Sequence, residues 1–270
     1  MCLIAFALDA HPRHRLVLAG NRDEFYHRAA DAAQWWHDRP TVLGGRDRQA
    51  LGTWLGMTRD GRVAALTNVR EGTPRARMGP SRGDLPRSFL DSTAAPMDHA
   101  RTLTADPNAP PAVYAGFNLL MIDLFAGLPR ACCLSNRDAA PRALESGVYG
   151  LSNHLMDTPW PKVERLKQAV RESCRADVSD DALERRLFEA LTDREVAEDA
   201  LLPRTGVPLE RERLLAPAFV SSTDYGTRAS TVLMADRNGQ VRFIERTWDG
   251  ADADARHYRE RRFGFRISGR

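Results

Sequence analysis

The chain opens with two short apolar runs, and this feature constrains the fold more than any other in the sequence. The runs Cys2–Leu8 and 15–20 are separated by residues 9–14, a polar stretch that contains Pro12. Short apolar runs bounded by polar and turn-forming residues predict β-strands. We therefore expect a β-hairpin that begins at residue 2, with the polar run Asn21-Arg22-Asp23-Glu24 directly after its second strand.

Turn dipeptides predict two further hairpins. Asp60-Gly61 lies between the β-rich runs 53–58 and 62–67, and Asn238-Gly239 lies between 230–235 and 241–247. Both dipeptides favour the tight turns that join antiparallel strands. Other strands are expected at 117–124, 131–135, 149–153 and 258–267.

Helices are expected in the middle of the chain. Short helices are predicted at 85–92 and 97–103, and a second pair follows strand 149–153. Thr158 is expected to cap a helix that has Pro159 at its first position, and another helix is expected to start near Ser179. Strands at both ends with helices between them predict an α+β protein of packed sheets covered by helices, in one domain over residues 1–270.

Composition and charge argue against several classes of protein. The chain has 270 residues, with 39 basic and 36 acidic side chains and a net charge of +3, and nearly all the basic residues are arginine. Nucleic-acid binding usually takes a clustered basic excess, which this balance does not favour. No apolar run is long enough to cross a membrane, and no secretory leader pattern precedes the first strand. We expect a cytoplasmic protein without membrane insertion.

Two groups of arginines have both a structural and a functional interpretation. One group is expected to lie on a solvated edge strand or tail, and the other on a surface loop at 71–87. The alternative for each is a site for a phosphate or another anion. The members are Arg256, Arg259, Arg261, Arg262, Arg266 and Arg270 in the first group, and Arg75, Arg77, Arg82 and Arg87 in the second.

Cys2 is the most informative of the four cysteines. No CxxC pair is present, which argues against a structural zinc site. A small residue at position 2 permits removal of Met1, which would leave Cys2 with a thiol and a free α-amine. Since such an amine has an unperturbed pKa of about 7.7–8.0, it can take the proton of the thiol, and one residue then supplies nucleophile and base. The alternative is a small buried residue in the first strand.

Polar residues at predicted strand ends complete a candidate site. Arg22 and Asp23 follow the second strand, where an aspartate can orient the α-amine and an arginine can lower the pKa of the thiol. Asn68 and Asn153 each end a strand, where an amide can donate to a developing oxyanion. Arg228 opens a later strand and can hold a substrate carboxylate or carbonyl. The alternatives are a solvated surface turn and ordinary turn asparagines.

Several runs of residues carry a resemblance to a known family. They are Met1-Cys2-Leu3-Ile4, Asn21-Arg22-Asp23-Glu24-Phe25-Tyr26, Gly52-Thr53-Trp54-Leu55-Gly56, Ala65-Leu66-Thr67-Asn68, Ser81-Arg82-Gly83, Gly116-Phe117-Asn118-Leu119, Tyr149-Gly150-Leu151-Ser152-Asn153, Thr158-Pro159-Trp160 and Tyr225-Gly226-Thr227-Arg228. Together these runs closely resemble the NRDE family, also called the transport and Golgi organisation protein 2 family. They follow the family order through most of the chain.

The resemblance implies a fold and a set of roles. Membership implies a four-layer αββα sandwich of the N-terminal-nucleophile hydrolase type. The polar residues also resemble those of the choloylglycine hydrolase and penicillin V acylase group, in which a terminal cysteine is nucleophile and base. That likeness implies catalytic roles for Cys2, Arg22, Asp23, Asn68, Asn153 and Arg228. Since the arginine and aspartate are adjacent here but spaced apart in that group, the role of Arg22 stays open.

Three functions stay open at this point. The first is Cys2-dependent hydrolysis or acyl transfer on a small-molecule amide or thioester, which requires no cofactor and no metal. The second is a carrier that binds haem without turnover, because the family has been linked to haem trafficking and to lipid or acyl-coenzyme A homeostasis; Cys2 or His154 would then ligate iron. The third is an interaction module on an old enzyme fold. The expected partner is a small molecule or haem, and the oligomeric state is open.

Overall fold

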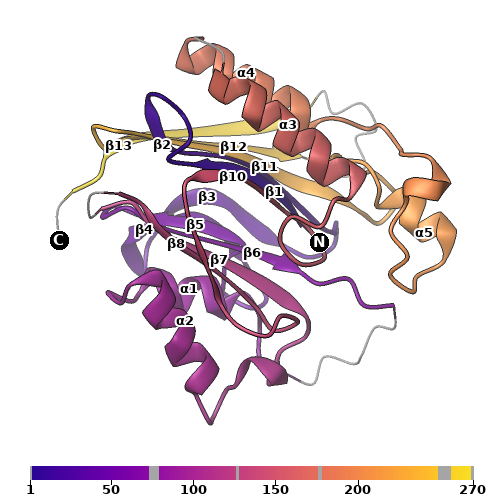
Figure 1. Ribbon diagram of the computed structural model, residues 1–270, viewed down its shortest axis with the longest axis horizontal. Coiled ribbons are helices and arrows are strands. Elements are labelled where there is room, and N and C mark those ends of the chain that lie inside the picture. The colour runs from indigo at the N-terminus through magenta and orange to yellow at the C-terminus, as the bar shows by residue number, and fades with distance from the viewer. Residues whose placement is uncertain (1, 73–78, 126–127, 176–177, 249–256, 269–270) are drawn as a thin grey trace.

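The computed structural model describes residues 2–72, 79–125, 128–175, 178–248 and 257–268. Two antiparallel sheets face each other in these residues (Figure 1). Sheet A has the strand order β10-β1-β2-β11-β12-β13, and sheet B has the order β3-β4-β5-β6-β7-β8-β9. The strands of sheet A are β1 (Cys2–Leu8), β2 (His14–Phe25), β10 (Gly147–Leu151), β11 (Tyr225–Asp236), β12 (Gln240–Trp248) and β13 (Tyr258–Arg266). Those of sheet B are β3 (Ala30–Trp36), β4 (Arg39–Asp47), β5 (Leu55–Thr58), β6 (Arg62–Asn68), β7 (Phe117–Asp123), β8 (Arg130–Ser135) and β9 (Arg142–Leu144).

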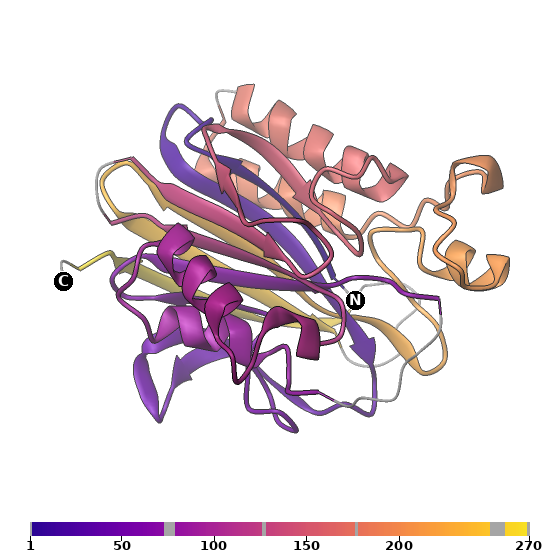
Figure 2. The same ribbon diagram turned by 60° about the horizontal axis from the view of Figure 1, so that its bottom comes forward.

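A helical layer covers the outer face of each sheet (Figures 1 and 2). Sheet A is covered by α3 (Pro161–Arg175) and α4 (Asp180–Leu191), and sheet B by α1 (Asp84–Leu90) and α2 (Pro96–Ala105). The short helix α5 (Leu209–Leu214) lies beside the sandwich with the one-turn segment Asp199–Leu201, and Pro111–Val113 forms another single turn. The expected α+β arrangement of four layers, αββα, is confirmed.

The unbroken apolar sequence of β1 follows from the position of the strand between two layers. Successive side chains of a strand point to opposite faces, and both faces of β1 are covered. Ile4 and Phe6 join the core between the sheets, whereas Leu3 and Ala5 join the core under α3 and α4. Because every residue of this strand is buried, its sequence is a continuous apolar run without alternation.

The predicted hairpins are confirmed. β1 pairs with β2, β5 with β6, and β11 with β12, all antiparallel. Gly61 and Gly239 occupy the turns of the last two pairs with φ of 89° and 81°, a left-handed conformation that costs glycine little. The helix expected near Ser179 is also present, and the Ser179 hydroxyl accepts the backbone N–H of Ala182 as its N-cap.

The structure differs from the sequence predictions at several places. The helix expected to begin at Pro159 begins at Pro161, and the carbonyl of Trp160 accepts its first backbone N–H groups. The run Asn21–Glu24 lies inside β2 rather than after it, because β11 pairs with it on the side away from β1. Strands β3 and β4 were not predicted: most residues of β3 are half-buried, the buried stretch of β4 contains two glycines, and neither strand alternates clearly. The short elements β9 and α5 were not predicted either.

One edge of sheet A carries a row of arginines. β13 is an edge strand, and Arg259, Arg261, Arg262 and Arg266 lie on it, as expected for an exposed, charged edge. Arg256 and Arg270 of the same group, and Arg75 and Arg77 of the loop group, lie outside the described residues.

Among the described helices, none has the length and hydropathy needed to traverse a bilayer.

Candidate active site

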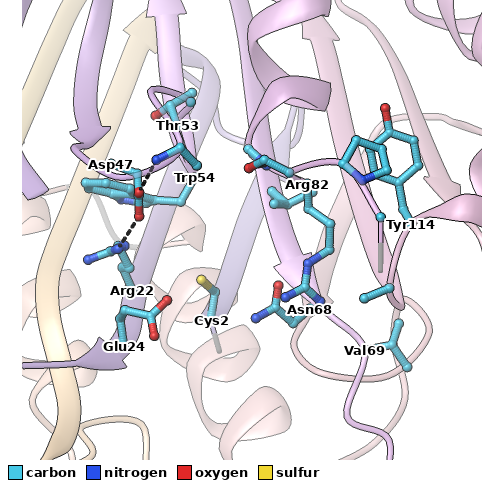
Figure 3. A pocket seen from close by; sticks show the side chains of 18 of the residues that line it. Cys2, Arg22, Glu24, Asp47, Thr53, Trp54, Asn68, Val69, Arg82 and Tyr114 are labelled. Atoms are coloured by element: carbon cyan, nitrogen blue, oxygen red, sulfur yellow. Dashed lines mark hydrogen bonds and ion pairs between the residues drawn. The ribbon is translucent and has the colours of Figure 1, made fainter. Parts of the chain in front are cut away.

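A cavity of about 850 Å³ lies where several strands of both sheets begin or end. β1 begins there with Cys2, and β2, β4 and β6 end there, close to Arg22, Asp47 and Asn68. Figure 3 shows these side chains around the cavity together with Trp54. Strands of the two sheets thus bring residues that are far apart in the sequence into one wall.

Cys2 lies in the cavity wall, directly opposite Arg22 across the β1–β2 ladder. Its main-chain oxygen accepts the Ser152 hydroxyl at 3.0 Å, which attaches the start of β1 to the end of β10. Burial raises the pKa of the Cys2 thiol; the charge of Asp23 raises it further, whereas the charge of Arg22 lowers it. Cys2 therefore rests as a neutral thiol, which needs a base before it can react.

Arg22 is held by an aromatic ring and a carboxylate. Its guanidinium lies 4.2 Å from the centre of the Trp54 ring, and its Nη2 donates to Oδ2 of Asp47 at 3.3 Å. The same Oδ2 accepts Nε of Arg28 at 2.6 Å, and Oδ1 accepts two backbone N–H groups of the loop after β4. Burial alone would raise the pKa of Asp47, but the hydrogen bonds and charges of its arginine partners bring it below the usual range. This network fixes a cation beside the thiol.

Asp23 points to the opposite side of sheet A. Its Oδ1 accepts the Thr227 hydroxyl at 2.8 Å, and its main-chain oxygen accepts the hydroxyl of Tyr225 at 3.0 Å. Burial raises the pKa of Asp23, and the charge of Lys162 is the largest influence that opposes this rise. Since Asp23 also lines the cavity next to Cys2, a carboxylate lies within the reach of an α-amine at the start of β1.

Asn68 lines the cavity across from the thiol, and Asn153 lies behind it. The amide of Asn153 donates to the main-chain oxygen of Asn68 at 3.0 Å, and Asn153 is fully buried. The main-chain oxygen of Asn153 accepts the backbone N–H of Arg70 at 2.7 Å. Asn68 is therefore placed where its side chain can donate into the cavity, and Asn153 holds its backbone in that position.

Residues 1–250 of the chain match the family described as Transport and Golgi organisation 2. The chain belongs to this family. A Transport and Golgi organization protein 2 homolog from Bos taurus is 37% identical over 271 residues, 93% of this chain and 95% of its own length. The homolog from Homo sapiens is 32% identical over 286 residues, 99% of each chain.

A solved structure shares the fold of this Transport and Golgi organisation 2 protein. It is the C2A mutant of the conjugated bile acid hydrolase from Clostridium perfringens, with a TM-score of 0.53, 8% sequence identity, and coverage of 99% of this chain and 97% of that one. The chain therefore has the N-terminal-nucleophile hydrolase fold that the sequence predicted. At this identity the likeness shows the fold alone.

Three of the expected site residues do not line the cavity: Asn153, which lies behind Asn68, and Arg228 and His154. Arg228 lies at an irregularity in the β2–β11 pairing, and its Nη1 donates to the main-chain oxygens of Phe25 and Tyr26. It therefore holds the turn after β2. His154 is exposed, and its ring Nδ1 lies 2.9 Å from the hydroxyl of Thr158. Neither side chain is part of the wall around Cys2.

The structure adds wall residues that the sequence did not assign to the site. Trp54 and Asp47 hold Arg22, and Arg28 binds the same Asp47. Arg82 and Tyr114 form the wall beyond Asn68 (Figure 3). A signal was present for two of them, because Trp54 and Arg82 lie in runs that resemble the family. For Asp47 the only cue was its position after a glycine pair, which predicts no particular partner.

Proposed function

We propose that this Transport and Golgi organisation 2 protein hydrolyses a small-molecule amide or thioester, or transfers its acyl group, through Cys2. The observation that carries the proposal is the placement of the Cys2 thiol in a cavity wall with Arg22, Asp23 and Asn68. A nucleophile, an orienting carboxylate and an amide donor converge there, which is the arrangement that acyl transfer needs.

The first half of the reaction forms an acyl-enzyme. After removal of Met1, the α-amine of Cys2 takes the proton of Sγ while Sγ bonds to the substrate carbonyl carbon. The carbonyl electron pair moves to oxygen, and the Asn68 side-chain amide donates to this oxyanion. When the pair returns, the bond to the leaving nitrogen or sulfur breaks, and the α-ammonium gives its proton to the leaving group.

The second half releases the acyl group. Water, or an acceptor in acyl transfer, loses a proton to the α-amine as its oxygen or nitrogen bonds to the thioester carbon. The bond to Sγ breaks, and the thiol regains its proton from the ammonium. The charge of Arg22 favours the thiolate at each step in which Sγ is the leaving or attacking atom.

The comparisons support this use of the cavity. The solved structure with the same fold is the C2A mutant of a conjugated bile acid hydrolase. In the present chain a cysteine occupies the second position and faces the cavity. A hydrolase of the same fold thus also has a cysteine as its second residue.

The haem-carrier hypothesis makes a different use of the same cavity. Among the described residues of its wall, Cys2 is the only cysteine or histidine, and His154 lies elsewhere. Iron ligation by cysteine takes the thiolate, whereas burial raises the pKa of this thiol. A haem titration followed by the Soret band, on the wild type, Cys2→Ala and His154→Ala, separates carrier from enzyme. We expect no Soret shift that depends on either side chain.

The decisive experiment is intact-mass spectrometry of the purified protein before and after incubation with panels of acyl amides and acyl thioesters. It reads the removal of Met1 and the formation of acyl-Cys2 together. We expect an acyl adduct on the wild type, none on Cys2→Ala, and an unchanged adduct on Cys174→Ala, a matched control at another buried free cysteine. Full turnover in Cys2→Ala, or no adduct from either panel on protein that lacks Met1, would contradict the proposal.

A further inference from the structure

Lysine is almost absent from this chain. Of its 39 basic residues only Lys162 and Lys167 are lysines, and both lie on α3. Lys167 is also buried but is neutralised by two carboxylates, since its Nζ lies 2.9 Å from Asp157 and 3.2 Å from Glu164. Lys162 is only 3% exposed, and its Nζ donates to the main-chain oxygen of Leu215 at 2.9 Å.

The charged groups around Lys162 come from each element packed against it. The charges that act on its ammonium belong to Asp23 of β2, Cys2 of β1, Arg70 after β6 and Glu212 of α5. Tyr225 of β11 lies in the same group, next to Asp23. Glu212 is engaged elsewhere, because Arg70 forms a buried ion pair with it and Thr205 donates to it through both its N–H and its hydroxyl. Asp23 is thus the carboxylate left to balance the ammonium of Lys162.

The alternation of β2 places this pair behind the nucleophile. Asn21 and Asp23 point toward the helical layer, where Asn21 donates to main-chain oxygens of Leu191 and Ala218. Arg22, between them, points into the cavity. The first turn of α3, which carries Lys162, packs on β1 and β2 from the helical side. The buried ammonium of Lys162 thus lies on the helical side of sheet A, where its charge acts on the buried carboxylate of Asp23.

We propose that Lys162 is a positioning residue for Cys2: its ammonium group keeps Asp23 in the carboxylate form, and Asp23 orients the α-amine that activates the thiol. This inference rests on the function proposed above and adds a residue to its machinery. Without the cation, a carboxylate buried to this depth binds a proton and can no longer hold a protonated amine.

Because residue 162 is a lysine and not an arginine, the activation of Cys2 should depend on pH. Arginine does not lose its proton in proteins, whereas burial lowers the pKa of Lys162 to about 8. The ammonium is therefore present at neutral pH and is lost as the pH rises through about 8. Above that pH Asp23 loses the cation that favours its carboxylate form, so it holds the α-amine less well and the activation of the thiol falls.

The test measures the rate of Cys2 alkylation by iodoacetamide between pH 6 and pH 10 on the intact protein, with the state of Met1 read by mass. The variants are Lys162→Met and Lys162→Arg, and Lys167→Met is the matched control from the same helix. We expect Lys162→Met to be alkylated about tenfold more slowly at neutral pH, which corresponds to a rise of about one pH unit in the midpoint. Lys162→Arg restores the neutral rate and lacks the inflection near pH 8, and Lys167→Met follows the wild type.

Three results would overturn the inference. An unchanged midpoint in a Lys162→Met protein that melts as cooperatively as the wild type shows a merely structural lysine, as does an equal shift in Lys167→Met. If Lys162→Met does not fold, Lys162→Arg decides alone, because an inflection near pH 8 that persists in it cannot come from Lys162. Alkylation needs no substrate, so a shifted profile together with an empty acyl panel refutes the proposed hydrolase and leaves the positioning role standing.

Discussion

Glu245→Gln is expected to stabilise the protein at neutral pH. Glu245 lies on β12 between the two sheets and is 1% exposed, and its Oε1 accepts the backbone N–H of Ala33 in β3 at 2.6 Å. Burial raises its pKa from 4.5 to about 7; the hydrogen bond from Ala33 and the charges of Arg22 and Arg261 oppose this rise. The folded protein therefore holds a proton on Glu245 that the unfolded chain releases.

The sign and size of the effect follow from this difference in pKa. Between pH 4.5 and about 7 the folded state binds one proton more than the unfolded state, so the free energy of unfolding falls as the pH rises. The contribution of the protonated carboxyl is complete below pH 4.5 and is lost by the time the pH passes about 7. At about 1.4 kcal/mol for each pH unit, the loss over this window amounts to about 3 kcal/mol. Glutamine keeps the acceptor for Ala33 but cannot ionise, so Glu245→Gln avoids the loss.

Urea denaturation of the wild type and of Glu245→Gln at half-unit pH steps from 4 to 8.5 measures this contribution. The difference in the free energy of unfolding between the two proteins isolates Glu245, because the other titrating groups are common to both. We expect the difference to grow by about 3 kcal/mol between pH 4.5 and pH 7.5 in favour of the variant and then to level off. A difference that stays constant with pH would refute the reasoning, since it would mean that Glu245 ionises as easily in the folded protein as in the unfolded chain.

Two further predictions concern the cavity wall. Asn68→Ala removes the proposed oxyanion donor, so we expect kcat to fall by a factor of about 10²–10³ with a smaller change in KM. Steady-state kinetics on a substrate from the acyl panel measure both constants. A raised KM with unchanged kcat would assign Asn68 to substrate binding instead. Asp47→Ala leaves Arg22 and Arg28 buried without their shared carboxylate. We expect a loss of about 3 kcal/mol in urea denaturation, and a loss below about 1 kcal/mol would show that the network adds little to stability.

The sequence predicted best where a single local rule governs the structure. The continuous apolar run of β1 required a strand with both faces covered, and Asp60-Gly61 and Asn238-Gly239 required tight turns whatever lay around them. Strands β3 and β4 were missed because apolar residues follow neither the two-residue period of a strand nor the 3.6-residue period of a helix in either segment. The start of α3 was displaced by two residues, since Thr158 uses its hydroxyl for Leu155 and His154 rather than for the first turn of the helix.

Only the part of the candidate site that lies on the β1–β2 hairpin was predictable from the sequence. Once β1 and β2 pair, the register sets Arg22 opposite Cys2, and a two-strand pattern in the sequence is enough to foresee that. The contributions of Trp54 and Asp47 depend on how sheet B packs over sheet A, which no local pattern encodes. The same holds for Lys162, whose partners come from elements far apart along the chain.

The adjacency of Arg22 and Asp23, which left the role of the arginine open in the sequence, has a physical consequence in the structure. Neighbouring residues of a strand face opposite sides, so an arginine and an aspartate in succession cannot both point at the thiol. Arg22 lies in the cavity wall on Trp54 and Asp47, whereas Asp23 lies toward the helical layer with Thr227 and Lys162. One pair of residues thus supplies a cation on the side of the thiol and a carboxylate on the side of the backbone amine. In the reaction proposed here these two groups need opposite charges beside them, and two successive residues of one strand meet that need without a spacer between them.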